Sequence, residues 1–406
     1  MGAEEHFTKL SGRRPPLGLR LLERVGRRLE YGSLEIDWPV RPAVLFAGTR
    51  EGPHARLVIR DPRMLRRVLS RGDLGFAEAW MAGEWDSPDL PALLECLLKN
   101  QEAVGGLQRR YSLLRWLQWL HQGVWRRNSR RGSRRNIAEH YDLGNDFYRL
   151  WLDESLTYSC AHFEGDVVDL AGAQQRKYAN LLDMLGVCEG DHILEIGCGW
   201  GGFAIHAARE RNCRVTAVTV SGEQLRLARE RAEQAGVADR VSFLFQDYRD
   251  ISGQFDAIAS IEMFEAVGEQ YWDSFFRTLH ERLQPGGRAV IQTITLDDAA
   301  FDEYRRRPDF IQTYIFPGGL LASPGGFAER AREHGLKVRE RRFRGADYAR
   351  TLADWQQRFT AAEEAVRRQG FDERFLRMWH YYLAYCRAGF RCGRIDLMNT
   401  VLERKG

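Results

Sequence analysis

The chain has 406 residues, a formal net charge of +4 and seven cysteines. This length is too great for one ordinary hydrophobic core, so we expect two domains. No uncharged apolar stretch is long enough to span a bilayer, and the first 30 residues lack the apolar segment of a signal peptide. The cysteines form no C-x-x-C pair, which speaks against a disulfide framework and a metal site and favours a reducing cytoplasm.

The first part of the chain, residues 32–105, reads as an α+β unit. The runs GSLEIDWPV and ARLVIRD predict short strands, and PRMLRRVLSRG, LGFAEAWMAGEW and DLPALLECLLKN predict helices. The segment has no nucleophile paired with a base and no metal-ligand spacing. We therefore expect residues 1–105 to form an N-terminal domain for binding or docking.

A basic and aromatic linker is expected over residues 106–135. Nine arginines and no acidic residue lie between Arg109 and Arg135, interleaved with leucines and tryptophans. This composition is typical of a segment that lies on anionic lipid headgroups. Composition alone favours docking of the tryptophans onto a domain, and a solvated connector is a further alternative. Nucleic acid binding would leave the aromatic stripe without a role, so no nucleic acid partner is expected.

The following segment, residues 136–163, is dense in aromatic and polar side chains. It places Cys160 at a loop position after Tyr158 and Ser159. A lone cysteine is more often a small buried hydrophobe than a reactive group, so this position alone indicates no chemistry.

The run ILEIGCGWGG at 193–202 predicts a buried strand, a glycine turn and the start of a helix. Glycines let a ligand approach the backbone closely, and doubly wound domains hold nucleotide-like cofactors at such a turn. The glycines also satisfy the dinucleotide pattern G-x-G-x-x-G. However, Glu195 precedes them, and the next strand ends in Thr219 and Ser221 instead of an acid. The sequence therefore favours S-adenosylmethionine over a nicotinamide cofactor.

Strands and helices alternate after this turn. Strands are predicted at 214–220, 240–247, 255–263 and 286–295, and helices at 222–236 and 269–283. The expected fold is α/β: a doubly wound, Rossmann-like methyltransferase domain over residues 136–406, with a smaller N-terminal α+β domain. In such a sheet the ligand lies over the carboxyl ends of the strands. The residues there are Thr219, 246–248, 261–265 and 292–295.

Seven motifs in chain order resemble the cyclopropane-fatty-acyl-phospholipid synthases, relatives of the mycolic acid cyclopropane synthases. They are HYDLGNDFYRLWLDESLTYSCAHF, LEIGCGWGGFAIHAA, VTVSGEQLRLA, SIEMFEAVG, YIFPGG, DYARTLADW and MWHYYLAYCRAGF. They run from residue 140 to residue 390 and cover nearly all of the C-terminal two thirds. The N-terminal unit resembles, less closely, the small lipid-binding-like domain of the bacterial phospholipid enzymes.

The resemblance implies a reaction at the double bond of a phospholipid acyl chain. The alkene attacks the methyl carbon of S-adenosylmethionine, and a base removes a proton from the resulting carbocation to close a cyclopropane ring. In this family the base is a bound bicarbonate. The resemblance assigns its contacts to Cys160, Glu265, the backbone of Ile294, and Tyr348, with Gln292 as a further catalytic position. Aromatic side chains would stabilise the transient positive charge.

Gln292 departs from the family pattern, which has a histidine at the end of this strand. Its amide can still donate a hydrogen bond to bicarbonate, but it cannot become cationic or relay a proton. Ring closure is therefore open to an alternative: a hydride shift and proton loss that give a methylene- or methyl-branched chain. A noncatalytic lipid-binding protein with a decayed methyltransferase domain is the second alternative, and a methyltransferase for small molecules or nucleic acids is a third.

The resemblance also carries cofactor contacts onto this chain. Tyr158 and Ser159 would reach the methionine part of S-adenosylmethionine, above the glycine turn. The candidate cofactor-binding residues are Tyr158, Ser159, Glu195, Gly197, Gly199, Gly201, Thr219, Ser221, Gln224, Gln246, Asp247, Tyr248 and Ile261. A strand-end cap is the alternative role for Thr219, and a rim aromatic is the alternative for Tyr248. Residues 310–323 would form an acyl-channel wall, a lid or a plain surface insertion.

The partners that follow are an unsaturated phospholipid and the anionic surface of the membrane. We expect a cytoplasmic protein that associates peripherally with the inner face of the membrane. Relatives are often dimers, so the resemblance leaves a homodimer open.

Overall fold

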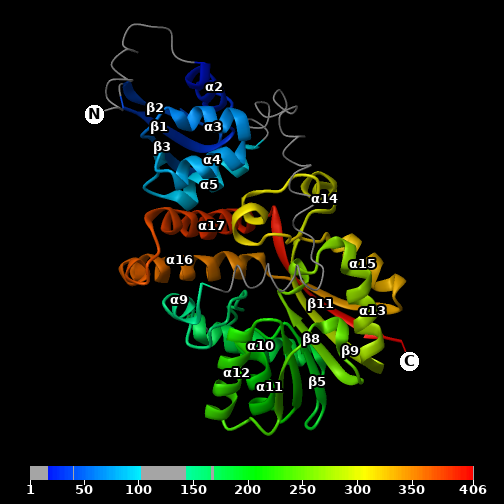
Figure 1. Cartoon of the computed structure of the whole chain (residues 1–406). Coiled ribbons are helices and arrows are strands. Elements are labelled where there is room, and N and C mark those ends of the chain that lie inside the picture. Colours follow the sequence, from blue (N-terminus) through cyan, green and yellow to red (C-terminus); the bar gives the residue numbers. More distant parts are fainter. Residues whose placement is uncertain (1–16, 40, 102–142, 166–168, 406) are drawn as a thin grey trace. The chain divides into compact units, whose positions relative to one another are not determined.

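The computed structural model describes residues 17–39, 41–101, 143–165 and 169–405 (Figure 1). The described residues form two compact units. One contains the residues up to 101 together with Arg367–Cys392, and the other contains residues 143–366 and 393–405. The predicted linker over residues 106–135 lies outside the described residues.

The first unit is built on a four-stranded sheet. Its strands are β1 (Tyr31–Trp38), β2 (Arg41–Ala47), β3 (Arg50–Ile59) and β4 (Trp85–Asp86), in the order β2-β1-β3-β4. Its first four described helices are α2 (Leu17–Gly26), α3 (Arg63–Arg71), α4 (Asp73–Met81) and α5 (Leu90–Lys99). Alternate residues of β1 are buried, as one covered face requires. The predicted strands and helices of this unit are present, although the helix predicted over residues 74–85 ends at Met81 and Trp85 lies in β4. Helix α2 and strands β2 and β4 are additions.

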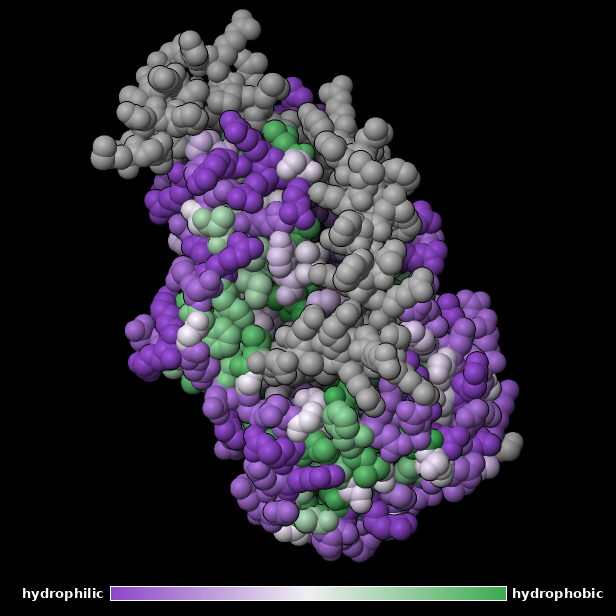
Figure 2. Space-filling model, in the orientation of Figure 1, coloured by the Kyte–Doolittle hydropathy of each residue, from purple (hydrophilic) through white to green (hydrophobic). Residues whose placement is uncertain are grey.

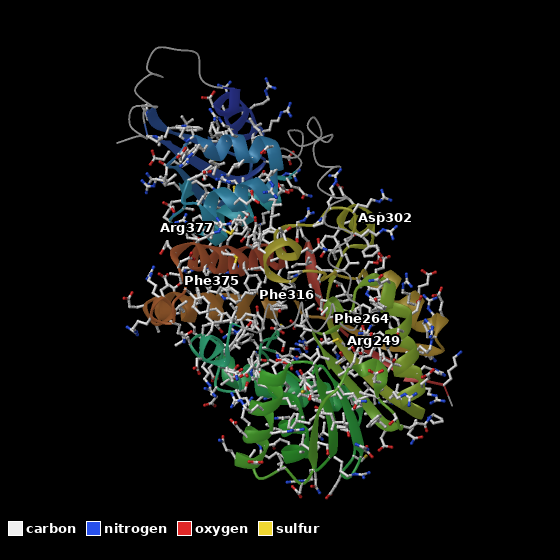
Figure 3. The ribbon with its side chains drawn as sticks, viewed as in Figure 1. Arg249, Phe264, Asp302, Phe316, Phe375 and Arg377 are labelled. Atoms are coloured by element: carbon white, nitrogen blue, oxygen red, sulfur yellow. The ribbon has the colours of Figure 1, made fainter. Side chains whose placement is uncertain are left out.

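A distant helix, α17 (Glu373–Arg391), also belongs to the first unit. Arg377 of α17, labelled in Figure 3, donates to the carbonyl oxygens of Trp80 (2.5 Å) and Trp85 (2.8 Å). Its guanidinium lies over the Trp80 ring, 4.0 Å from the centroid. Arg391 donates to Glu95 of α5 at 2.6 Å. The sequence-based boundary, which kept residues 136–406 together, did not anticipate this grouping, because it depends on contacts nearly 300 residues apart in the chain.

The second unit contains an α/β sheet, as predicted, and this sheet has seven strands. The strand order is β10-β11-β9-β8-β5-β6-β7. Strands β5 to β9 are mutually parallel, and β11 runs antiparallel to both of its neighbours, β9 and β10. The strands are β5 (His192–Ile196), β6 (Arg214–Thr219), β7 (Val241–Phe245), β8 (Phe255–Ile261), β9 (Leu283–Leu296), β10 (Leu336–Phe343) and β11 (Ile395–Arg404). The five predicted strands correspond to β5 to β9.

Helices cover both faces of this sheet (Figure 1). The helices are α9 (Asn145–Arg149), α10 (Leu170–Leu185), α11 (Gly202–Arg211), α12 (Gly222–Gln234), α13 (Trp272–Arg282), α14 (Asp298–Tyr304), α15 (Pro324–Glu333) and α16 (Gly345–Arg368). Short turns of helix are η2 (Tyr248–Asp250), η3 (Phe264–Ala266), η4 (Glu269–Tyr271) and η5 (Ile311–Ile315). Consecutive residues of β5 enter opposite cores: Ile193 packs with α10 to α12, and Leu194 packs with α13 and α15.

Hydrophilic residues cover most of the described surface on the face shown in Figure 2, with hydrophobic residues gathered in patches. Among the described residues, no helix combines the length and the apolar character needed to cross a membrane.

Candidate functional site

The site lies where the direction of sheet winding reverses. The chain runs from β5 to β6 and β7 on one side, and then returns to β8 and β9 on the other. Open α/β sheets bind ligands in the crevice at the carboxyl ends of the strands at such a point, here between β5 and β8. The glycine turn follows β5, and the motif SIEMFEAVG contributes the end of β8.

The glycine turn depends on backbone conformations that favour glycine. Gly197, Gly199 and Gly201 have φ angles of +84°, +51° and +82°. A Cβ at Gly197 would lie 2.7 Å from Cγ of Met263, so the turn is in close contact with the segment after β8. A Cβ at Gly199 would meet nothing within 4 Å. Gly199 therefore borders open space, as a position over which a ligand lies must do.

Glu195 connects the strand before this turn to the helix after it. The side chain is 2% exposed and interacts with the backbone of Ala204 in the first turn of α11, which ties the strand to the helix that follows the glycines. Burial raises the pKa of Glu195 well above its ordinary value, and Oε2 has no hydrogen-bond partner among the described residues. A direct contact with the cofactor stays a prediction.

The end of β6 forms a closed cap. The Thr219 hydroxyl donates to Oε1 of Gln224 at 2.9 Å and accepts from the backbone of Ser221 at 3.1 Å. Ser221 in turn caps α12 by accepting from the backbone of Gln224. These three predicted cofactor residues are brought together, and their contacts match the alternative role of a strand-end cap.

The residues after β7 have separate environments. Gln246 donates to the Asp250 carbonyl at 2.7 Å, and Asp247 pairs with Arg249 at 2.6 Å. Tyr248 is 9% exposed, belongs to the core beneath the sheet, and its ring centroid lies 5.7 Å from that of Phe275. Tyr248 is therefore part of the core and is not the rim aromatic considered above.

The most connected group at the site is the carboxylate of Glu262. Its Oε1 accepts from the backbone N–H of Cys160 and from Nε2 of Gln292, both at 2.8 Å. Its Oε2 accepts from the hydroxyl of Tyr348 at 2.5 Å. Three of the positions predicted to hold bicarbonate thus converge on one carboxylate, which the sequence analysis did not single out. Burial raises the pKa of Glu262, although these three donors act in the opposite direction.

The fourth predicted donor is also paired with a carboxyl group. The backbone N–H of Ile294 donates to Oε1 of Glu265 at 2.6 Å. Burial and the neighbouring charge of Glu262 raise the pKa of Glu265 to about 8. Glu265 is therefore mainly protonated at neutral pH.

An aromatic anchor fixes the segment that carries both carboxyl groups. Phe264, labelled in Figure 3, is fully buried between Glu262 and Glu265, and its ring packs on Phe275 (5.0 Å between centroids) and Phe327 (5.2 Å). The Glu265 carbonyl accepts from the backbone of Leu320 at 2.9 Å. This bond ties the 310–323 insertion to the site.

Aromatic rings gather around Tyr158. Its ring centroid lies 5.3 Å from Trp355, 5.4 Å from Trp151 and 6.4 Å from Phe316 of the insertion. Trp355 in turn lies 6.2 Å from Tyr348, which donates to Glu262. The structure thus connects the predicted aromatic environment to the carboxylate cluster. Ile261, at the end of β8, directly precedes Glu262.

Cys160 contributes its backbone and keeps its thiol protonated. Burial raises the thiol pKa well above its ordinary value, and Sγ donates to the Ala161 carbonyl at 3.1 Å. Next to it, Ser159 accepts from the ammonium of Lys177 at 2.6 Å. Lys177 is fully buried, which lowers its pKa to about 8, and its charge interacts with Glu262 and Cys160.

Sequence reasoning missed Glu262, Lys177 and the buried His162, whose pKa burial lowers to about 2. A signal for Lys177 exists, since it lies on the same helical stripe as the buried Leu170, Ala173 and Leu181. Glu262 fell within the range 261–265 at the strand end, but the sequence could not show which glutamate accepts the donors.

Comparisons with known proteins agree with this geometry. A family model for mycolic acid cyclopropane synthetase matches residues 128–400. A tuberculostearic acid methyltransferase of Mycobacterium tuberculosis is 41% identical over 86% of this chain and 82% of its own length. A cyclopropane-fatty-acyl-phospholipid synthase of Escherichia coli strain K12 is 35% identical over 86% of this chain and 88% of its own.

A solved structure extends the likeness to three dimensions. The crystal structure of a mycolic acid cyclopropane synthase complexed with S-adenosylhomocysteine (SAH) and CTAB is 30% identical, covers 67% of this chain and 98% of its own, and has a TM-score of 0.63. The chain therefore belongs to the mycolic acid cyclopropane synthetase family and is an S-adenosylmethionine-dependent methyltransferase.

Proposed function

We propose that this chain transfers the methyl carbon of S-adenosylmethionine to the double bond of an unsaturated phospholipid acyl chain. The glycine turn over residues 197–201 would hold the cofactor, with Tyr158 and Ser159 at its methionine part. Loss of a proton from the resulting carbocation gives a cyclopropane fatty acyl chain.

The observation that carries this proposal is a hydrogen-bonded carboxylate with aromatic rings beside it at the sheet switch point. Glu262 accepts a hydrogen bond from the Tyr348 hydroxyl. The Tyr348 ring packs near that of Trp355, which in turn packs near that of Tyr158. A carbocation needs electron-rich faces to stabilise it and a base to remove its proton. The arrangement supplies both, at the place where a doubly wound sheet binds its ligand.

Bicarbonate does not fit the residues present. Cys160, Gln292 and Tyr348 already donate to Glu262, and Ile294 already donates to Glu265. Among the buried oxygens of this cluster, Oε2 of Glu265 and Oε1 of Gln292 form no hydrogen bond with the part of the chain that the structure describes. Protonated Glu265 supplies at most one O–H donor and the Gln292 oxygen only accepts, so they cannot replace the three donors that Glu262 takes up. We therefore assign no step to bicarbonate.

A branched product is the second candidate. A hydride shift in the cation before proton loss would give a methylene-branched chain instead of a ring. Two observations favour it: the 41% identical relative is named a methyltransferase, and Gln292 stands at the family's histidine position. The two candidates share the methyl transfer and differ in the fate of the cation.

The lipid-bound substrate is supported by the Escherichia coli relative, whose name specifies fatty-acyl phospholipid. The arginine-rich run over residues 106–135 would bring the chain to an anionic membrane surface from the cytoplasmic side. We keep a homodimer as an open proposal.

The test is a product analysis with vesicles. The purified chain is incubated with methyl-¹³C-labelled S-adenosylmethionine and vesicles of monounsaturated phospholipid. NMR of the extracted lipid then distinguishes a labelled ring CH₂ from a labelled vinyl CH₂ or methyl branch. Vesicles of saturated phospholipid are the matched control and should give no product. Cofactor turnover on water-soluble acceptors without any labelled lipid would refute the proposal.

A further inference from the structure

The Glu262 carboxylate occupies a built anion site at the centre of the cluster. The donors come from three separate parts of the chain: the loop before α10 supplies Cys160, β9 supplies Gln292, and α16 supplies Tyr348. We propose that Glu262 stands in the place of bicarbonate and is itself the base of the reaction. This inference rests on the proposed function and names its proton acceptor.

The backbone of Glu262 supports a specific role for the side chain. Its φ angle is +50°, a left-handed conformation that favours glycine and strains the backbone of any larger residue. The conformation is held by the backbone N–H of Glu262, which donates to the Gln292 carbonyl at 2.8 Å, and by the buried ring of Phe264. The glutamate at position 262 therefore adopts a strained backbone conformation, and in this conformation its carboxylate accepts hydrogen bonds from these donors.

The charges around Glu262 keep it able to accept a proton. Glu265 faces it from the same segment and is mainly protonated at neutral pH, since its pKa is raised to about 8. From α10, Lys177 favours the ionised form of Glu262. From the loop before α10, the Cys160 thiol stays neutral because burial raises its pKa. Because three donors converge on Glu262, whereas Glu265 accepts from the backbone N–H of Ile294, we assign the ionised carboxylate of the cluster to Glu262.

The chemical step balances with the groups at hand. The alkene π electrons form a bond to the methyl carbon, and the S–CH₃ bond breaks with its electron pair going to sulfur. A C–H bond of the transferred methyl then breaks, its electron pair forms the new carbon–carbon bond, and the proton goes to the Glu262 carboxylate. No oxidant or further reactant is needed.

The role of Gln292 follows from this assignment. Its amide Nε2–H orients a carboxylate that is part of the chain, and this task needs one neutral donor. A carboxylate that is covalently part of the chain stays in the site without a cationic partner, whereas a free anion is held there only by its contacts. Gln292 and Glu262 therefore form one functional pair.

The experiment compares two substitutions that differ in whether they open the anion site. Glu262→Gln keeps the shape and fills the site without a base. Glu262→Gly removes the side chain, suits the positive φ angle and opens the site to a small anion. Turnover on monounsaturated phospholipid vesicles is measured in buffer freed of carbon dioxide, and then with added bicarbonate or formate. The cofactor dissociation constant and Tm verify that each variant is folded.

We expect wild-type turnover to be the same, within about twofold, with and without bicarbonate. Glu262→Gln should lose roughly 10²- to 10⁴-fold in turnover under both conditions, the usual contribution of a general base. Glu262→Gly should show a similar loss that added bicarbonate or formate partly reverses.

Three results would overturn the inference: wild-type turnover that depends on bicarbonate, a Glu262→Gln variant that stays active, or a folded Glu262→Gly variant that no small carboxylate restores. A wild-type protein that makes no lipid product under any condition would instead refute the proposed function, so the two failures are distinguishable.

Discussion

Gly199→Ala distinguishes two roles of this glycine in the turn after β5: it adopts a positive φ angle, and it leaves space for the cofactor. Gly199 has φ +51°, and a Cβ there would meet nothing within 4 Å. Gly236, just after α12, is a matched control with φ +66° and equally open space. Alanine in a left-handed conformation costs roughly 1–2 kcal/mol, so both variants should lose about this much free energy of unfolding.

Only Gly199→Ala should also weaken cofactor binding. If S-adenosylmethionine lies over the turn, an added methyl group overpacks the contact by about 1–3 kcal/mol. That penalty corresponds to a rise of roughly ten- to a hundredfold in the dissociation constant. Calorimetric titration with S-adenosylmethionine measures the affinity, and urea unfolding measures the stability. Equal affinities in the two alanine variants would refute the placement of the cofactor over this turn.

Three further predictions address other parts of the chain. Because the pKa of Glu265 rises from 4.5 to about 8 on folding, the folded state should lose stability as the pH increases between these values, and turnover should fall above about pH 8; a turnover–pH profile of Glu265→Gln should lack this alkaline fall, and its persistence would assign it to another group. Arg377→Ala should lower the free energy of unfolding by about 2–4 kcal/mol through the loss of its bonds to Trp80 and Trp85, whereas Arg377→Lys recovers only part of this loss; urea unfolding of both variants checks this, and an unchanged Arg377→Ala would contradict the docking of α17. Replacing the arginines between Arg126 and Arg135 with glutamine should weaken sedimentation with anionic vesicles, with a smaller difference at high salt; unchanged sedimentation would make the run a connector.

The parallel strands were predictable because burial on both faces leaves runs that are apolar except for single residues such as Glu195. The run ILEI of β5 and the run IASI of β8 are such segments, and their alternation with helical patterns fixes the fold class. The edge strands β10 and β2 were not predictable in the same way, whereas the edge strand β7 was predicted. Strand β10 carries the charged run KVRERR, and β2 contains Pro42 and the exposed Leu45, so neither shows the pattern of a buried strand.

The site was predictable as a set of positions but not as a network. Cys160, Gln292 and Tyr348 were singled out from motifs, and the structure brings all three together. Their common acceptor could not be recognised, because a glutamate next to Met263 at a strand end reads as an ordinary polar residue. The left-handed backbone at Glu262 is set by tertiary contacts and has no local sequence signal.

The path of the chain through α17 has a practical consequence for dissecting this enzyme. The polypeptide leaves the catalytic unit after Val366, contributes α17 to the N-terminal unit and returns at Gly393 to form β11. No single cut can therefore release either unit intact. A fragment ending near residue 105 would lack the helix that Arg377 anchors, and a fragment beginning near residue 136 would carry that helix with its docking surface bare. Chimeras between relatives should exchange α17 together with the N-terminal segment.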